Sequence, residues 1–257
     1  MQSDALLLPF QGEPLKKNAQ GPKRRRPRDT EQGNAGPLKK SEVTREKILE
    51  AARKVFALHQ YHAASIRMVA REGGFGHGII RYYFPSKADL FQAVLNEVCE
   101  DLYHMTVVWL EETRRMPPRD GLARYMEHLL AFDTEKPEAL RILVQNMALM
   151  DSPTSMPGHD RVIRLLTDTQ RVFKEKLPLR APSEMVRMYL DSFNGLMLYY
   201  LGASPCQAGI LGVDPAGQEY RNWVRDTMVS VFLPLLQSMT ARSARPKERK
   251  GRRTKRS

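Results

Sequence analysis

Residues 44–95 decide the fold of this chain, and they read TREKILEAARKVFALHQYHAASIRMVAREGGFGHGIIRYYFPSKADLFQAVL. Apolar residues recur every three or four positions from Thr44 onward, which predicts a helix with one buried face. Thr44 would open this helix, although Lys47 stands where a glutamate would complete a capping box. Ser65 can cap a second helix, because its hydroxyl can accept a hydrogen bond from the backbone of the first turn. The stretch therefore begins with two amphipathic helices joined by a short connection.

A glycine pair, Gly73 and Gly74, follows the second helix. Glycine adopts the left-handed backbone conformation without a steric cost, so the second helix should end there. Phe75 would fill the turn, and a short third helix is expected over HGIIRYYF, residues 77–84, before Pro85 breaks the chain. Two helices around a tight glycine turn form a helix-turn-helix, which places its second helix in the major groove of DNA.

The same stretch, about fifty residues long, resembles the DNA-binding domain of the tetracycline-repressor (TetR/AcrR) family. The resemblance implies a three-helix domain that is joined through a helix to a larger helical ligand-binding and dimerisation domain. It also implies a homodimer that binds the two half-sites of a palindromic operator in double-stranded DNA. The rest of the chain resembles the family only in outline.

By this resemblance, a set of residues corresponds to positions that contact DNA. Arg67 would reach a base edge, and the arginine fork suits guanine. Ser65, Tyr83 and Lys87 correspond to phosphate contacts, with Lys87 in the first turn of its helix, where backbone N–H groups also attract phosphate. The outward positions of the recognition helix are His77, Gly78, Ile79, Arg81 and Tyr82.

Four positions depart from the usual family pattern. Ile79 replaces a common threonine and offers only apolar contact, whereas Arg81 replaces a common tyrosine and brings reach to a base or a phosphate. Gly76 replaces a usual serine cap, and Ala64 replaces a usual threonine. These departures predict an unusual operator sequence, not a loss of DNA binding. The alternative is that the glycine turn joins two helices of an unrelated bundle.

The two ends of the chain carry most of its positive charge. Residues 1–40 contain nine basic and four acidic residues, and residues 241–257 contain nine basic residues and one acidic residue. Both segments are poor in apolar residues, so we expect a disordered basic N-terminal arm and a disordered basic C-terminal tail. Whether they contact DNA or only add solubility and non-specific attraction stays open.

The ordered part is expected to divide into a DNA-binding domain, residues 41–90, and a ligand-binding and dimerisation domain, residues 91–240. No segment shows strand alternation bounded by hairpin turns, which predicts an all-α fold. Ser86 would cap the continuous helix that joins the two domains, and Pro215 would begin the last helix. The expected helices cover residues 87–115, 119–134, 138–150, 159–176, 183–203 and 215–239.

The last two expected helices are apolar on more than one side, so each must be buried on more than one side. Packed against their copies, they would form the four-helix seam of a homodimer. The alternative, that these helices are simply the core of a monomer, stays open. The expected seam residues are Tyr189, Phe193, Met197, Tyr200, Trp223, Met228, Val231, Phe232 and Leu235.

The resemblance places a ligand cavity among the helices between residues 100 and 200. The thirteen methionines of the chain favour an adaptable apolar lining. Taken singly, each candidate is more readily explained as an ordinary core residue. The candidates are Met105, Trp109, Tyr125, His128, Phe132, Gln145, Met147, Met150, Phe173 and Asn194.

Neither catalysis nor a resident cofactor or metal is expected. His104 and His128 lack further ligands at metal-binding spacing, and the two cysteines form no CxxC pair. No nucleophile–base pair or phosphate loop indicates an enzyme. No apolar run approaches the eighteen residues of a membrane-spanning helix, so we expect a cytoplasmic, nucleoid-associated protein with no membrane partner.

The favoured function is therefore a homodimeric transcriptional repressor that a small hydrophobic ligand releases from its operator. Such a ligand must bind the released form better than the DNA-bound form. Two alternatives stay open. One is a non-specific DNA-binding protein that uses its basic tails, and the other is an all-helical enzyme or small-molecule carrier with a vestigial helix-turn-helix.

Overall fold

The structure, a computed structural model, describes residues 37–147 and 156–240. Every regular element in these two ranges is helical, which confirms the expected all-α fold. Most of the expected N-terminal arm, the C-terminal tail and Met150 lie outside the described residues.

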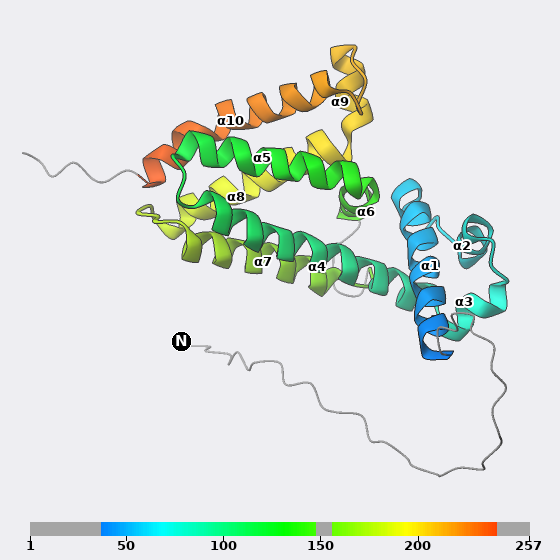
Figure 1. Ribbon diagram of the computed structural model, residues 1–257. Coiled ribbons are helices and arrows are strands. Elements are labelled where there is room, and N and C mark those ends of the chain that lie inside the picture. The colour runs from blue at the N-terminus through cyan, green and yellow to red at the C-terminus, as the bar shows by residue number, and fades with distance from the viewer. Residues whose placement is uncertain (1–36, 148–155, 241–257) are drawn as a thin grey trace, which may run out of the picture. The chain divides into compact units, whose positions relative to one another are not determined.

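Ten α-helices and one π-helical turn, η1, form the regular structure of the described residues (Figure 1). They are α1 (Pro37–Leu58), α2 (Ile66–Gly73), α3 (His77–Tyr83), α4 (Lys87–Thr113), α5 (Pro118–Glu135), α6 (Pro137–Met147), α7 (His159–Lys176), α8 (Ser183–Met197), η1 (Leu198–Gly202), α9 (Ser204–Leu211) and α10 (Gln218–Thr240).

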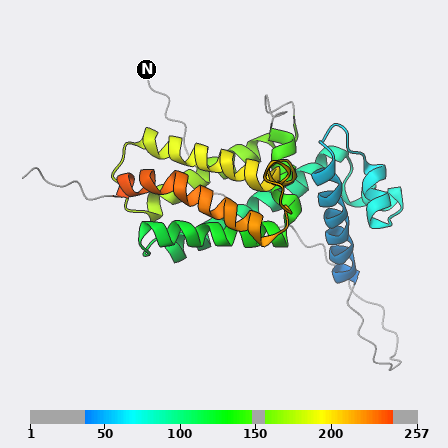
Figure 2. The same ribbon diagram turned by 90° about the horizontal axis from the view of Figure 1, so that it is seen from above.

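Helix α4 links the two parts of the fold without a flexible connection, as the sequence predicts. Helices α1, α2 and α3 lie at its N-terminal end, and its remaining turns pack along α7 (Figures 1 and 2). Helix α5 packs along α10, and α6 packs against both α1 and η1. The α4 helix therefore belongs to both parts, and α6 forms a second connection between them.

Helix α1 begins at Pro37, ahead of the expected start at Thr44. Proline suits the first turn of a helix because its missing N–H would have no partner there. Thr44 consequently lies inside α1 and does not cap it. The helix also includes residues 37–40, which the sequence analysis assigned to the N-terminal arm.

The connection before the last helix differs from the sequence expectation in two ways. Residues expected to be a break form α9, which starts with the Ser204-Pro205 pair. Pro215 does not begin the last helix, because α10 starts at Gln218. Asp214 explains the delay: its Oδ1 atom accepts a hydrogen bond from the N–H of Ala216 at 3.0 Å. Such a side-chain turn competes with helix initiation.

The helix expected over residues 183–203 changes to π geometry at Leu198. Gly202 closes this turn where the backbone approaches α6. A Cβ atom at Gly202 would overlap the Val144 side chain and lie 3.0 Å from the carbonyl oxygen of Leu140. The glycine therefore permits close packing of η1 on α6, in line with the use of π turns to adjust local packing.

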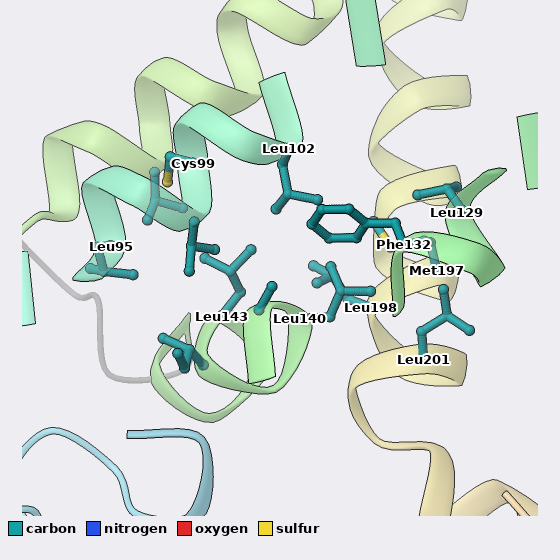
Figure 3. Close-up of a cluster of buried hydrophobic side chains, with 14 of the residues drawn as sticks. Leu95, Cys99, Leu102, Leu129, Phe132, Leu140, Leu143, Met197, Leu198 and Leu201 are labelled. Carbon is teal, nitrogen blue, oxygen red and sulfur yellow. The ribbon is translucent and has the colours of Figure 1, made fainter. Parts of the chain in front are cut away.

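A continuous apolar core joins these helices. Figure 3 shows side chains from α4, α5, α6, α8 and η1 meeting between the ribbons, with Leu102 and Phe132 near the centre of the view. In the N-terminal part, the Phe91 ring of α4 lies 4.8 Å from the Phe56 ring of α1 and 4.8 Å from the Tyr61 ring. Edge-to-face aromatic packing of this kind fixes α1 on the first turns of α4.

Candidate nucleic-acid interface and ligand cavity

The turn between α2 and α3 has the geometry that the sequence predicts. Ser65 caps α2, since its Oγ atom accepts a hydrogen bond from a first-turn N–H at 3.3 Å. At the other end, Gly74 has a φ of 68°, which strains any residue with a side chain. Gly73 meets a different constraint, because a Cβ atom there would overlap the ring of Phe75, which fills the turn. The two glycines thus fix where α2 ends and how α3 begins.

Helix α3 buries Ile80 completely, and the positions that the sequence predicts to face outward are exposed. Ile79 is 47% exposed and Tyr82 is 81% exposed. His77 and Gly78 in the first turn are also exposed. The burial pattern agrees with the prediction that this face of α3 is available to a partner.

The exposed guanidinium groups of the helix-turn-helix include Arg67 in the first turn of α2 and Arg81 on α3. Within the described residues, neither group has an ion-pair partner. Arginine presents a planar fork of donors that matches the acceptor pair of guanine or a phosphate. These two side chains are therefore free to donate to DNA.

Tyr83 lies between this face and α1. Its side chain is half-buried, and its hydroxyl oxygen lies 3.3 Å from the hydroxyl of Ser41. Its ring meets the ring of Tyr82 edge to face at 5.2 Å. A half-buried tyrosine with its hydroxyl at the surface suits the expected phosphate contact.

Lys87 does not point outward as a phosphate contact would. Its ammonium group donates to the carbonyl oxygens of Tyr61 at 2.8 Å and Ala64 at 3.0 Å. It also lies 4.4 Å from the centre of the Tyr61 ring, where cation–π attraction adds to the hydrogen bonds. Burial lowers the pKa of this amine below its usual value. The carbonyls of the loop between α1 and α2 lack helical partners, which explains why the lysine folds inward.

Ser86 caps α4 as expected, and Asp89 completes a reciprocal capping box that the sequence analysis missed. The Asp89 backbone N–H donates to Ser86 Oγ at 3.1 Å, and Asp89 Oδ2 accepts from the Ser86 backbone N–H at 3.0 Å. The serine–acid spacing of three residues is the signal that could have revealed it. With a carboxylate already at this helix start, a phosphate is less favoured there.

The helical body contains a cavity of about 250 Å³ between α4, α5, α7, α8 and α10. Three predicted candidates line it: Tyr125, Phe173 and Asn194. A smaller cavity of about 50 Å³ shares Tyr125 and Asn194 and adds Met147 of α6. The sequence analysis missed most of the lining, including Thr113, Arg114 and Thr169.

Five other candidates line neither of these cavities. His128 of α5 forms a hydrogen bond with Glu112 at 2.9 Å and stacks on the buried Trp109 of α4, so both rings serve the packing of α5 on α4. Gln145 donates to the carbonyl oxygen of Ala57 at 2.6 Å. Met105 and Phe132 belong to the apolar packing of the body. Each is an ordinary structural residue, the alternative that the sequence analysis left open.

Most of the expected dimer-seam residues are buried inside a single chain. Tyr189 and Phe193 line the cavity, and Met197, Met228 and Phe232 are also buried. Three others, Tyr200, Trp223 and Leu235, are partly buried. Only Val231 is well exposed, at 53%. The apolar richness of α8 and α10 thus reflects burial within the chain, because sequence alone cannot separate an inner face from an interface.

A different set of side chains forms the exposed stripe on α8. Met185 and Met188 of α8 are 39% and 60% exposed, Tyr199 of η1, which continues α8, is 41% exposed, and Ser192 and Gly195 lie between them. Their spacing of three or four residues keeps them on one face of the helix. The sequence signal for this stripe is that, at about 100° of rotation per residue, its positions fall on a different face of the helix from the buried positions such as Val186, Tyr189 and Phe193.

The described residues contain no group of His, Cys, Asp and Glu side chains that could hold a metal ion. Within the same ranges, no helix is both long enough and apolar enough to cross a membrane.

A capped α2, a glycine turn and an exposed, arginine-bearing α3 define a helix-turn-helix DNA-binding domain. Residues 48–94 match the family described as bacterial regulatory proteins, tetR family. The chain thus carries the N-terminal domain of the tetR family, as the resemblance implied.

One curated relative and two solved structures extend this result. Over 86 residues the chain is 36% identical to the HTH-type transcriptional repressor AcnR of Corynebacterium diphtheriae, a match that covers 34% of this chain and 44% of the relative. The chain thus spans less than half the length of that relative.

Beyond the N-terminal domain, the likeness concerns the fold. A tetR-family transcriptional regulator from Streptomyces coelicolor superposes with a TM-score of 0.54 at 18% identity, covering 80% of this chain and 92% of that one. A transcriptional regulator from Rhodococcus sp. RHA1 gives a TM-score of 0.53 at 22% identity, covering 77% of this chain and 99% of that one. The helical body therefore shares the architecture of these regulators.

Proposed function

We propose that this protein is a homodimeric transcriptional repressor that binds a palindromic operator through α2 and α3 and leaves it when a small molecule fills the cavity. One observation carries the DNA-binding part: Arg67 and Arg81 are exposed within a helix-turn-helix, and neither has an ion-pair partner in residues 37–147 or 156–240. Such a protein would act on chromosomal DNA in the cytoplasm. The AcnR relative is itself named a transcriptional repressor, which supports the sign of the regulation.

For the interface with DNA, we assign base reading to the outward positions of the helix-turn-helix. Arg67 and Arg81 would donate to base edges, and Ile79 would contact a thymine methyl group. His77 and Tyr82 are exposed beside them, and Gly78 leaves room for close approach of the backbone. Ser65 and Tyr83 would position the domain on phosphates.

For the dimer, the partner is a second copy of this chain bound through the exposed stripe of α8. A Cβ atom at Gly195 would have nothing within 4 Å, so another helix can approach closely there. Val231 adds exposed apolar surface on α10, which packs on α8. A self-complementary face of this kind gives the two-fold symmetry that a palindromic operator requires.

For the release step, contacts from α6 to the end of α1 and to the loop that follows it would transmit a movement of the helical body to the helix-turn-helix. Gln145 donates to the carbonyl oxygen of Ala57, and the fully buried Asn146 accepts from the N–H of Tyr61 at 2.9 Å. Lys87 binds the carbonyl oxygen of the same Tyr61. A movement of α6 would therefore reach the loop that sets the position of α2.

The two cavities would connect a bound ligand to α6. Tyr125, Phe193 and Asn194 line both, so they stand between the larger cavity and the smaller one beside α6. A ligand that displaces these side chains would press on Leu143 and Met147 of α6. Since a ligand shifts an equilibrium only by its differential affinity, it must fit the released conformation better.

The test is a selection from randomised duplexes at about 0.15 M salt with the full-length chain. We expect a palindrome, and we expect the double variant Arg67→Ala/Arg81→Ala to lose it. Arg164→Ala, which removes an exposed arginine from α7, is the control and should select the same sequence. Binding that ignores sequence and falls steeply with salt would instead support the non-specific alternative, in which the basic tails bind DNA.

A further inference from the structure

We propose that the 250 Å³ cavity selects uncharged aromatic molecules that carry a hydrogen-bonding group, and that it discriminates against their anionic analogues. This ligand preference gives the chemical class of the effector. Only the statement that the ligand is an effector rests on the proposed function. The selection of ligands is a property of the cavity itself.

Four aromatic residues form a contiguous group on the otherwise mainly aliphatic wall of the cavity. Phe173 and Tyr189 stack with their centroids 5.6 Å apart, and Tyr189 stacks in turn on Phe193 at 6.3 Å. Tyr125 meets the Phe193 ring edge to face at 6.0 Å. Rings arranged in both orientations offer faces and edges to a bound ring, which favours a planar aromatic ligand over a branched aliphatic one.

Charge is nearly absent from the lining. Arg114 is the one charged side chain on the described wall, and it lies at the rim with its guanidinium 2.6 Å from Glu111 Oε1. Lys176 binds the other oxygen of Glu111 at 2.7 Å. The hydrogen bond from Lys176, followed by the one from Arg114, lowers the pKa of Glu111 to about 2. The Glu111 carboxylate therefore stays ionised and paired with Arg114. An anion inside the cavity would find no unpaired cation, and burying an unpaired charge is strongly unfavourable.

Uncommitted polar groups remain on the wall. The side chains of Tyr189, Asn194 and Thr169 have no hydrogen-bond partner among the described residues. By contrast, the Thr113 hydroxyl donates to the carbonyl oxygen of Trp109 at 2.8 Å. Burial raises the pKa of Tyr189, which keeps its hydroxyl a neutral donor. None of these polar atoms is both fully buried and unpartnered, so they are accessible from the cavity, and a hydroxyl, amine or carbonyl on the ligand would find partners there.

Two fluorescent probes that differ by one group test the charge selection. N-Phenyl-1-naphthylamine is uncharged, and 8-anilino-1-naphthalenesulfonate has the same aromatic body with a sulfonate added. Fluorescence titration of the full-length protein should give one saturable site per chain for the neutral probe. The sulfonate should bind about tenfold more weakly or worse, because its charge would lose hydration without gaining a counterion.

Three variants locate the site and test its chemistry. Thr169→Trp places an indole in the cavity and should abolish binding of the neutral probe, whereas Thr167→Trp on the exposed face of α7 should leave it unchanged. Thr169→Lys supplies the missing cation and should reverse the preference toward the sulfonate. Circular dichroism of each variant would check that the fold is kept.

Two results would overturn the proposal. One is equal or tighter binding of the sulfonate to the unmodified protein, lost in Arg114→Gln, which would make the site one for amphipathic acids. The other is binding of the neutral probe that Thr169→Trp does not affect. Operator release is measured separately: a neutral probe that binds the cavity without releasing DNA would contradict the effector role but leave the ligand class intact.

Discussion

At the scale of single residues, substitution of Arg67 or Arg81 distinguishes recognition of bases from general electrostatic attraction to DNA. Arg67→Ala and Arg81→Ala should each weaken binding to the selected operator by about 1–3 kcal/mol and relax preference at one base position. Neither should lower the melting temperature, because neither side chain has a partner within the described residues. Fluorescence anisotropy on the operator and on single-base variants measures both effects. Unchanged affinity in both variants would refute this assignment of the DNA contacts.

For Lys87 we expect the opposite result, an effect on stability and not on DNA binding. Its ammonium group satisfies loop carbonyls and caps the Tyr61 ring, so Lys87→Met should lower the free energy of unfolding by about 1–3 kcal/mol. A lysine that binds phosphate would instead reduce the slope of log affinity against log salt by about one on substitution. Thermal melts and a salt titration distinguish these outcomes. A flatter salt slope with unchanged stability would restore the phosphate contact that the sequence resemblance implied.

At the scale of elements, two exposed glycines of the helix-turn-helix should respond differently to alanine. Gly73→Ala should destabilise the domain by about 1–3 kcal/mol, because the added methyl group overlaps the Phe75 ring. Gly78→Ala has open space and improves helix propensity, so it should stabilise the free protein by about 0.5–1 kcal/mol. If the α3 backbone approaches DNA at Gly78, the same variant should bind the operator more weakly. Chemical denaturation and operator titration together test the pair.

The contact between α6 and α1 predicts a change in coupling. Gln145→Leu removes the hydrogen bond to Ala57 while keeping much of the side-chain volume. The fold-difference in operator affinity with and without a cavity ligand should shrink by up to about tenfold, because typical coupling energies are about 1–3 kcal/mol. Ligand affinity in the absence of DNA should not change. Gln237→Leu, on the exposed surface of α10, is the control. Undiminished coupling in Gln145→Leu would exclude this contact as the route.

How far the sequence predicts these elements depends on whether the signal is local. The α2–turn–α3 geometry follows from Ser65, the glycine pair and Phe75, which interact within a few residues, and all are as predicted. The late start of α10 depends on how Asp214 turns the chain. Helix α9 forms in a segment whose proline and glycine content predicted a break, so that content alone was not a sufficient signal. The inward turn of Lys87 also escaped prediction, because its partners lie more than twenty positions away.

At the scale of the whole molecule, the same limit applies more strongly to cavities and interfaces. Tyr189 and Phe193 are aromatic positions on an apolar helix, and nothing in the pattern separates a cavity wall from a dimer seam. The distinction depends on which face of α8 meets α7 and α10 of the same chain. Met188 and Gly195, on the other face, are the residues left for a partner.

The prediction that belongs to the scale of the whole molecule is the homodimer formed through α8. Gly195→Arg adds a large charged side chain to the exposed stripe of α8, where the single chain has space for it. It should therefore fold normally, yet elute as a monomer, while the unmodified protein elutes as a dimer at micromolar concentration. Operator affinity should fall by at least about 10²-fold, since a monomer engages only one half-site.

Gly209→Arg is the matched control, because it adds the same side chain at an exposed position of α9 that also has open space. It should remain a dimer and keep its operator affinity. Light scattering coupled to size exclusion separates the outcomes. A monomeric unmodified protein would contradict the dimer altogether, and a dimeric Gly195→Arg variant would move the interface off α8. In the second case Val231 of α10 is the next residue to test, because it is the one predicted seam residue that is well exposed in the single chain.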